Sequence, residues 1–386
     1  MIAAVFWLAV ATVAYTYVGY PLILRGLAAR RRAPAAGPAA RPSLSVVVAA
    51  FNEAGCIADK LRTTVGQRYP ADRLEVIVVS DGSTDGTDAI VAGYPDPRVR
   101  LVRQEPRAGK SLALNRGVAA ARGDLLVFTD ANALFAPDAL ARLAAPFGDG
   151  RVGLVSGQGL YGTAGHDARA VAGGYVRYEA VVKTGEGRLG FLASADGAVY
   201  ALRRRLYRDL GASEVNDLLH PIQAALAGAE CRFEPDAITV EPPSRDGGQE
   251  FRRHVRIIAQ GAHLLRGWLP RLVAARRWRA VWMLVSHRVL RWTSAPFLAT
   301  ALAANVALAG ESPLYLLVLG GQSAFYALAA AGLAGERFGR GLGRLAVPYY
   351  FCLVSAAGLA GLARAARGGA DAVWSPTGQR TAERAA

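Results

Sequence analysis

The sequence LEVIVVSDGSTDGT, residues 74–87, joins an apolar run to a turn rich in Gly, Ser, Thr and Asp. The run at residues 76–80 predicts a strand buried on both faces, as in a parallel sheet. Asp81 then lies at the carboxyl end of this strand, the edge at which open α/β sheets bind ligands. The alternative is that Asp81 and Asp85 only form Asx turns and cap the next helix.

The neighbouring segments repeat this alternation of strand and helix. Apolar runs predict further strands at residues 44–51, 99–102 and 124–129, and helical patterns lie between them, one at residues 108–121. The spacing predicts an α/β fold with a Rossmann-like, mostly parallel, doubly wound sheet. Three of the strands end on an acid: Glu53, Asp81 and Asp130.

Acids that gather at one edge of a sheet repel one another unless a cation or ligand donors lie among them. Asp130 and Asn132 are two residues apart, and both carry oxygen atoms that suit a hard cation. The pattern predicts a divalent metal ion that bridges to a diphosphate.

Long uncharged runs indicate that the chain is also a membrane protein. Residues 2–24 carry no charge and are long enough to cross a bilayer, and three further runs occupy residues 292–309, 314–333 and 345–362. A signal peptide is the alternative for the first run. No basic segment precedes it, however, and Arg25 and Arg30 follow it, so we interpret it as an uncleaved anchor.

The net charge of +15 comes largely from Arg residues beside the apolar runs. This placement favours contact with anionic lipid over nucleic acid, and it places the large polar segment in the cytoplasm. Three scattered cysteines agree with a reducing compartment. We therefore expect a multi-pass protein of a bacterial inner membrane with a cytoplasmic catalytic domain. Four crossings would put the carboxyl terminus outside, whereas Arg364 and Arg367 favour the inside, and the sequence does not resolve this conflict.

Four motifs, VVVAAFNE, VVSDGSTDGT, RAGKSLALNRG and FTDAN, occur in this order between residues 46 and 132. They resemble the nucleotide-sugar-binding half of family-2 glycosyltransferases, and the resemblance covers about residues 44–237. It implies the GT-A fold, a UDP-sugar donor, and Mg or Mn as cofactor. It also implies that Glu53 and Asp81 contact the uridine, and that Asp130 begins the metal-binding DxD motif, in which Asn132 replaces the second Asp.

Further residues of these motifs are candidates for substrate contacts. Lys110 is one of only three lysines and suits a phosphate or ribose, with an idle surface lysine as the alternative. Asn115, five residues on, is predicted to face the same cleft. The segment ADGAVYALRR at residues 195–204 resembles the family's acceptor side, with Asp196 at the turn.

Asp217 is the candidate catalytic base. It opens the helical pattern in SEVNDLLHPIQAALAG, residues 213–228, at the place where the family carries two acids, and Asn216 stands for the first of them. The alternative is that Asn216 and Asp217 only cap the helix. An inverting transfer needs one carboxylate to take the proton of the acceptor hydroxyl, and the leaving diphosphate needs no acid.

Residues 249–266 predict an amphipathic helix at the membrane surface, with a basic face that includes Arg253 and Arg256. Processive family members carry a QxxRW motif here, and this chain lacks both its Gln and its Trp. Arg253 and Arg256 lie at the place of this motif and are still candidates to bind a diphosphate, with lipid anchoring as the alternative.

The sequence thus predicts an inverting, metal-dependent hexosyltransferase that acts on a polysaccharide or lipid-linked acceptor, with export or assembly partners unknown. A polyprenyl-phosphate glycosyltransferase and an inactive membrane scaffold of a glycan export system are the alternatives. The predicted parts are an anchor (1–27), a linker (28–42), a GT-A domain (43–245), interface helices (246–280), transmembrane helices (281–366) and a tail (367–386).

Overall fold

The computed structural model describes residues 1–31, 41–162, 173–242, 247–339 and 342–368. Most of the predicted linker and nearly all of the predicted tail lie outside these ranges. The chain divides into two compact units. The sheet unit contains Leu27–Pro243 and Trp268–Ala280, and the helical unit contains Met1–Gly26, Ser244–Gly267 and Val281–Ala370. Each unit is described by itself.

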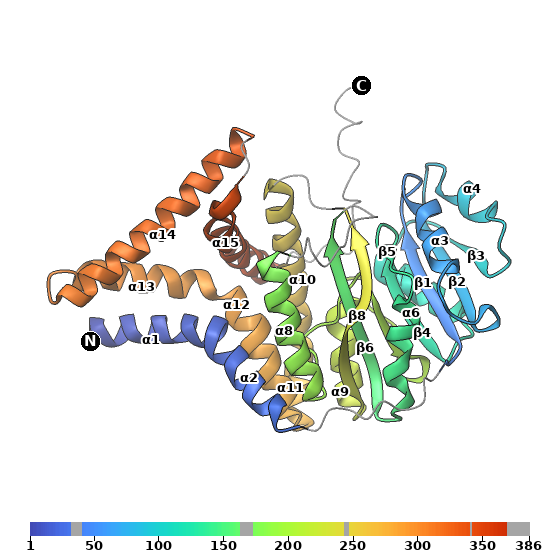
Figure 1. The fold of residues 1–386 in the computed structure, drawn as a ribbon, viewed down its shortest axis with the longest axis horizontal. Coiled ribbons are helices and arrows are strands. Elements are labelled where there is room, and N and C mark those ends of the chain that lie inside the picture. The colour runs from blue at the N-terminus through green and yellow to red at the C-terminus, as the bar shows by residue number, and fades with distance from the viewer. Residues whose placement is uncertain (32–40, 163–172, 243–246, 340–341, 369–386) are drawn as a thin grey trace. The chain divides into compact units, whose positions relative to one another are not determined.

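The sheet unit is built on eight strands in the order β3-β2-β1-β4-β7-β6-β8-β5 (Figure 1). Strands β3, β2, β1 and β4 run parallel, as do β6 and β8, whereas β7 and β5 pair antiparallel with their neighbours. The strands are β1 (Leu44–Ala50), β2 (Leu74–Asp81), β3 (Val99–Gln104), β4 (Leu125–Asp130), β5 (Leu134–Phe135), β6 (Val152–Tyr161), β7 (Tyr200–Arg203) and β8 (Glu230–Glu241). The predicted α/β sheet is confirmed, and its second half is mixed.

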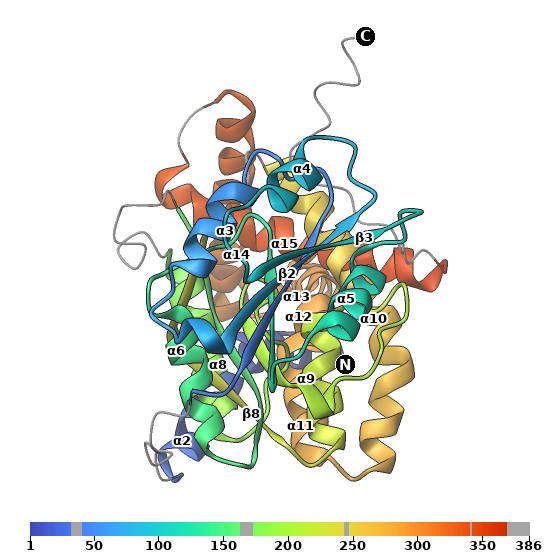
Figure 2. The same ribbon diagram turned by 90° about the vertical axis from the view of Figure 1, so that its right-hand side faces the viewer.

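Helices cover both faces of the sheet. Within the sheet unit they are α3 (Ile57–Val65), α4 (Thr87–Ala92), α5 (Lys110–Ala120), α6 (Ala139–Ala144), α8 (Gly174–Arg188) and α9 (Asn216–Leu226). Figure 2 shows α3 and α5 on opposite sides of β2. The central strands are therefore buried on both sides, which explains their nearly continuous apolar sequences.

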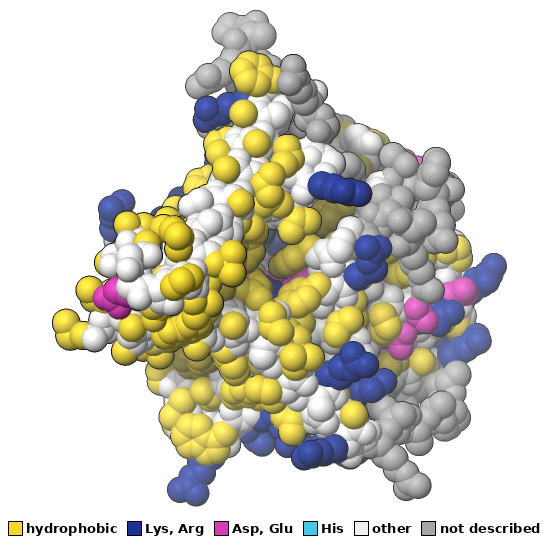
Figure 3. Space-filling model, turned by 60° about the vertical axis from the view of Figure 1, so that its left-hand side comes forward, with side chains coloured by type: hydrophobic (Ala, Val, Ile, Leu, Met, Phe, Trp, Pro, Cys, Tyr) yellow, Lys and Arg dark blue, Asp and Glu magenta, His cyan; other side chains and the backbone are white. Residues whose placement is uncertain are grey.

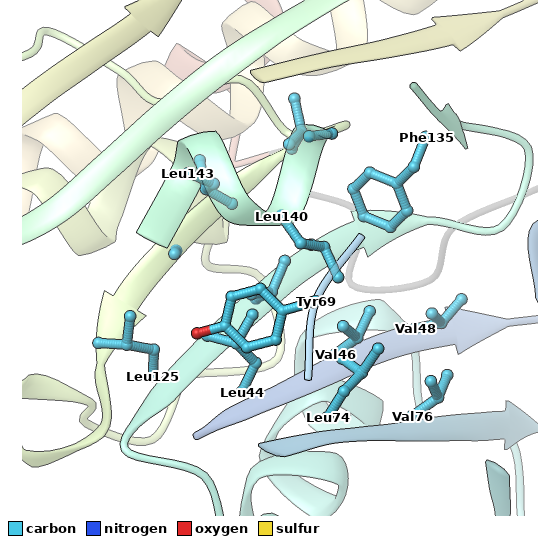
Figure 4. Packing of buried hydrophobic residues seen from close by; sticks show 14 of the residues in the cluster. Leu44, Val46, Val48, Tyr69, Leu74, Val76, Leu125, Phe135, Leu140 and Leu143 are labelled. Carbon is cyan, nitrogen blue, oxygen red and sulfur yellow. The ribbon is translucent and has the colours of Figure 1, made fainter. Parts of the chain in front are cut away.

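One face carries the main hydrophobic core. Alternate strand residues such as Val46, Val76 and Val127 point to the same side and pack with Leu140 and Leu143 of α6. Figure 4 shows these two leucines directed at the strands, with Tyr69 beside Leu44 and Leu125 where the strands begin. The alternation matches the twofold period of a strand.

On the other face α5 lies close to the strands. A Cβ built on Gly117 would be 2.4 Å from Cγ1 of Val47 and 3.0 Å from Cγ2 of Val79, so glycine is required for this approach. The rings of Phe128, Tyr200 and Tyr207 stack on this face and pack around His220 of α9. This packing holds the first turn of α9 against β4 and β7.

The helical unit contains three helices long and apolar enough to cross a membrane, Ile2–Ala29, Pro313–Arg337 and Gly343–Ala366, among the residues that the structure describes. They contain α1 (Ile2–Ala14), α2 (Tyr20–Ala29), α14 (Pro313–Arg337) and α15 (Ala346–Ala366), and a π-helical turn at Tyr15–Gly19 joins α1 to α2. These helices match three of the four predicted spans.

The fourth predicted span, residues 292–309, forms a shorter helix. Here α13 (Ser294–Leu308) has 15 residues and follows α11 (Trp278–Leu284), a π-helical turn at Val285–Val289 and α12 (Leu290–Trp292). The Thr293 hydroxyl donates to the Val289 carbonyl at 3.0 Å where α12 ends. The apolar run is thus divided between helical segments, and α13 alone is too short to qualify as a span.

Side-chain contacts join these helices. Phe6 and Ala9 of α1 pack with Ala301 and Leu308 of α13. The two π-helical turns are linked because the Tyr15 hydroxyl lies 2.8 Å from the Ser286 hydroxyl. Figure 3 shows hydrophobic side chains gathered on the outer surface of the helices, and large apolar residues such as those at 8, 22, 317 and 347 are more than half exposed. Such a surface suits lipid rather than water.

The predicted amphipathic helix at residues 249–266 is also present, as part of the longer helix α10 (Gly247–Ala274).

Candidate active site

The active-site candidates of the sheet unit gather where β1, β2 and β4 end. Ala50 pairs with Ser80, and Ala49 pairs with Asp130, so the three strands end side by side. Asn52, just beyond β1, adopts a positive φ of 56°. Its Oδ1 accepts a hydrogen bond of 2.8 Å from the Thr84 amide, which joins the turn after β1 to the turn after β2.

Asp81 is 2 % exposed, and its carboxylate is used by the protein itself. It accepts hydrogen bonds from Gln104 Nε2 at 2.7 Å and from the amides of Ala108 and Gly109 at 2.8 and 2.9 Å. Gly109 has a φ of 97°, a conformation that favours glycine. Asp81 therefore holds the loop that leads into α5, and its predicted contact with uridine stays a prediction.

Glu53 lies in the turn after β1. Its Oε2 accepts from the Cys56 thiol at 3.1 Å, and its amide donates to the Thr87 hydroxyl at 2.8 Å. Burial raises the pKa of the Glu53 carboxyl, and the negative charges of Asp130 and Asp85 raise it further. The predicted crowding of acids at this edge is therefore present.

Lys110, the first residue of α5, donates a hydrogen bond to the Asp130 carboxylate. Burial works against the charge of the ammonium, but the attraction of Asp130, followed by those of Asp217 and Glu241, outweighs it and raises the pKa of Lys110. The contacting side chains remain 26 % and 37 % exposed, so a ligand can reach them. One cation thus lies among three acids that come from different elements.

Lys60 is a feature of this edge that sequence reasoning missed. It is fully buried in α3, donates to the Thr129 hydroxyl at 2.7 Å and to the Ala133 carbonyl, and lies 3.7 Å from the centre of the Phe135 ring. These contacts hold both ends of the segment that carries Asp130 and Asn132. Burial lowers the pKa of Lys60 to about 7, against the opposing attraction of Asp130 and Glu241.

Glu241 was also missed. It ends β8, is 9 % exposed, and acts electrostatically on both Lys60 and Lys110. The signal in the sequence was another strand that ends on an acid, but its strand lacks the long apolar run of the others. Glu241 joins the acidic group at this edge.

Asp196 precedes β7. Its carboxylate accepts from the amides of Gly159 and Ala198 at 3.1 and 3.2 Å, and Lys183 Nζ lies 3.4 Å away. It therefore organises the turn at 196–198. A Cβ built on Gly197 would lie 3.5 Å from Oδ2 of Asp217, which places this turn directly beside the candidate base.

Asp217 is half-buried in the first turn of α9. Its carbonyl accepts from the Ala195 amide at 2.8 Å, which fixes the turn against the 195–197 segment. Val215 is the N-cap residue of α9, with no side-chain cap hydrogen bond, so Asn216 is the first residue of the helix. Asn216 Nδ2 donates to the Tyr200 hydroxyl at 2.7 Å, so this side chain does not form the helix cap that the alternative interpretation assigned to it.

The remaining predicted residues have other surroundings. The amide of Asn115 contacts the Tyr207 hydroxyl and both backbone groups of Leu210, which gives it a structural role in holding α5 to this loop. Arg253 and Arg256 lie on α10 within the helical unit, where Arg253 Nη1 is 3.8 Å from Glu250 Oε2. Substrate contact by these three residues stays a prediction.

Comparisons with known proteins agree with this geometry. A model of the glycosyl transferase family 2 matches residues 45–206. The succinoglycan biosynthesis protein ExoO of Rhizobium meliloti is 39% identical over 102 residues, which are 26% of this chain and 29% of that protein. The probable glycosyltransferase YdaM of Bacillus subtilis is 27% identical over 257 residues, 62% of this chain and 60% of that protein. These matches span less than two-thirds of either relative.

A solved structure extends the similarity to nearly the whole chain. The mannosyltransferase PcManGT from Pyrobaculum calidifontis, in complex with GDP-Man and Mn2+, is 26% identical and superposes with a TM-score of 0.68. The alignment covers 95% of this chain and 99% of that chain. The fold is therefore GT-A with attached helices, and residues 45–206 form a domain of the glycosyl transferase family 2.

Proposed function

We propose that the chain transfers a sugar from a nucleoside-diphosphate sugar to an acceptor, with inversion at the anomeric carbon. The observation that carries this proposal is the contact of Lys110 with Asp130, together with the electrostatic reach of Lys110 to Asp217. This arrangement brings together, at one accessible place, Lys110 as a cation for the diphosphate, Asp130 as a ligand for a metal ion and Asp217 as a base for the acceptor.

Asp217 and Lys110 act on the two bonds that change at the anomeric carbon, the bond to the acceptor and the bond to the diphosphate. The Asp217 carboxylate takes the proton of the acceptor hydroxyl as its oxygen attacks the anomeric carbon. The bond from that carbon to the diphosphate breaks with its electron pair, and Lys110 offsets the charge that develops on the leaving group. Asp81 and Asp196 hold the turns that carry these groups.

The donor set at Asp130 fits a divalent cation that also binds phosphate oxygens. Mg2+ commonly takes one or two carboxylates from a protein and completes its shell with phosphate and water. Asp130 and the Asn132 carbonyl oxygen are both partly exposed and would hold it. The described residues contain no cluster of three or more His, Cys, Asp or Glu that could hold a metal ion. Mg or Mn would supply charge stabilisation of the diphosphate.

The motifs and the relatives support particular donor and acceptor classes. The motifs favour a UDP-sugar, whereas GDP-Man is bound by the Pyrobaculum neighbour, so both nucleotides belong in the test. A polysaccharide or lipid-linked acceptor is supported by the candidate membrane helices and by the similarity to a succinoglycan biosynthesis protein. The arginines that follow the first span support a bacterial inner membrane with the sheet unit in the cytoplasm.

The experiment uses the full chain in detergent with Mn2+ or Mg2+ and a panel of UDP- and GDP-sugars. Release of nucleoside diphosphate with one donor, dependent on an added membrane-lipid extract, is the expected result. A ladder of products would indicate a growing polysaccharide, and a single glycolipid would indicate a polyprenyl-phosphate acceptor. Nucleotide binding without release from any donor in the presence of the extract would contradict the proposal and favour the scaffold.

A further inference from the structure

We infer that Asn216, Tyr200 and His220 form a neutral hydrogen-bonded chain that positions Asp217, so that they are positioning residues for the proposed base. This inference rests on the proposed function. Asn216 Nδ2 donates to the Tyr200 hydroxyl at 2.7 Å, and the same hydroxyl lies 2.8 Å from His220 Nδ1. The Tyr200 oxygen accepts from Asn216, and we assign its own proton to His220 Nδ1, which makes His220 the tautomer that carries its proton on Nε2.

All three side chains belong to the interior. Asn216 is 5 % exposed, and Tyr200 and His220 are fully buried. Burial lowers the pKa of His220 to about 3 and raises the pKa of Tyr200 well above its ordinary value, so both stay neutral. The ring of His220 lies 5.1 Å from that of Phe128 and 5.2 Å from that of Tyr207. Buried networks of this kind fix a unique arrangement.

The hydrogen bonds among Asn216, Tyr200 and His220 hold the turn that carries Asp217. Asn216 and His220 are four residues apart, so they lie on the same face of α9, with Tyr200 of β7 bound between them. Asp217 follows Asn216 and points to a different side of the helix, beside the turn at Gly197. A fixed Asn216 therefore fixes the backbone of the first turn of α9, and with it the direction in which the Cα–Cβ bond of Asp217 leaves the helix.

The amide also replaces a charge. The family resemblance leads one to expect an acid before the base, and a second carboxylate at residue 216 would be buried beside Asp217. It would repel the charged base and would need the Tyr200 proton for its own hydrogen bond, leaving His220 without it. The neutral amide instead keeps the direction of donation from Asn216 through Tyr200 to His220.

The test compares two buried tyrosines. Tyr200→Phe removes the hydroxyl between Asn216 and His220. Tyr69→Phe is the matched control, because this 7 % exposed tyrosine donates to the Pro42 carbonyl near the start of β1, at the other end of the parallel strands. We expect kcat of Y200F to fall about 10- to 100-fold with KM for the donor unchanged, and kcat of Y69F to stay at the wild-type value.

A rescue distinguishes positioning from packing. His220→Asn keeps an acceptor near the place of Nδ1, whereas His220→Leu fills similar space without one. We expect H220N to retain a higher kcat than H220L when both are equally stable. Equal kcat for the two, or a Y200F enzyme with wild-type kcat, would overturn the inference.

Hydrogen exchange tests the positioning without any turnover. The Leu219 amide donates to the Val215 carbonyl at 2.9 Å in the first turn of α9. We expect this amide to exchange faster in Y200F than in the wild type, and at the wild-type rate in Y69F. Unchanged exchange in Y200F would contradict the inference. If the wild-type protein shows no transferase activity but the amide still exchanges faster in Y200F, only the proposed function is refuted.

Discussion

The Lys110 ammonium donates to the Asp130 carboxylate, and the loop that presents Lys110 is held by Asp81 through the Gly109 amide. Three motifs that are distant in the sequence thus form one connected structure. A metal ion that binds to Asp130 must share this carboxylate with Lys110, and a diphosphate that binds to Lys110 must share its ammonium with Asp130. The pair therefore provides the charge balance of the site before substrate binds.

We expect Lys110→Met to lower kcat/KM by about 100-fold, because a donor that stabilises developing charge contributes on this scale. The binding of nucleoside diphosphate, measured by calorimetry, should weaken as well. Arg62→Met is the control, since Arg62 pairs at 2.9 Å with Asp59 on the exposed surface of α3. Wild-type kinetics for K110M would remove Lys110 from the site.

Glu53→Gln should stabilise the protein at neutral pH. The folded state binds the Glu53 proton more tightly than the unfolded chain does, so ionised Glu53 destabilises the fold as pH rises above the ordinary value of 4.5. Thermal unfolding should give a higher Tm for E53Q than for the wild type at neutral pH, and the difference should vanish as pH falls below 4.5. A lower Tm for E53Q at neutral pH would show that Glu53 is stabilising.

Lys60 should impose a different pH dependence on stability. Folded Lys60 loses its proton at a pKa of about 7, whereas the unfolded lysine keeps it up to about 10.5. Between these values the unfolded chain binds more protons, so the free energy of unfolding rises with pH. Chemical unfolding across this range should show a steeper rise for the wild type than for Lys60→Met. Parallel curves would mean that Lys60 stays charged when folded.

Gly117→Ala should destabilise the sheet unit by about 1–3 kcal/mol, because overpacking forces side chains or backbone to shift. The added methyl group would meet Val47 at 2.4 Å, whereas a Cβ on Gly150 meets no atom within 4 Å. Gly150→Ala is therefore the control and should change stability by less than about 0.5 kcal/mol. Equal unfolding curves for the two variants would show that α5 can move away from the sheet.

The parts of the fold that sequence predicted are those with local signals. Strands β1, β2 and β4 are mostly apolar because both of their faces are buried. The acids at or just beyond their carboxyl ends meet at one edge because the strands are parallel. Strand β8 gave no such signal. Arg232, Glu234 and Asp236 interrupt its apolar pattern, and its pairing with β6 joins segments that are distant in the chain.

The parts of the site that were missed depend on long-range packing. Lys60 contacts Ala133, 73 residues away, and only the packing of α3 on the end of β4 shows that this lysine is buried. Likewise, the sequence gave no reason to connect Tyr200 with Asn216 and His220. The pairing of β7 with β4 brings the tyrosine under α9, where its hydroxyl contacts both residues.

The most direct test of Asp217 as the catalytic base is the transfer of labelled sugar by Asp217→Asn, with the donor and acceptor extract that give the highest wild-type activity. A positioned general base contributes about 100- to 10,000-fold, so D217N should lose this much kcat while it still binds donor. Asp72→Asn, on an exposed turn before β2, should transfer sugar at the wild-type rate. Transfer by D217N at the rate of the wild type would contradict the account, because the acceptor proton would then leave through another group.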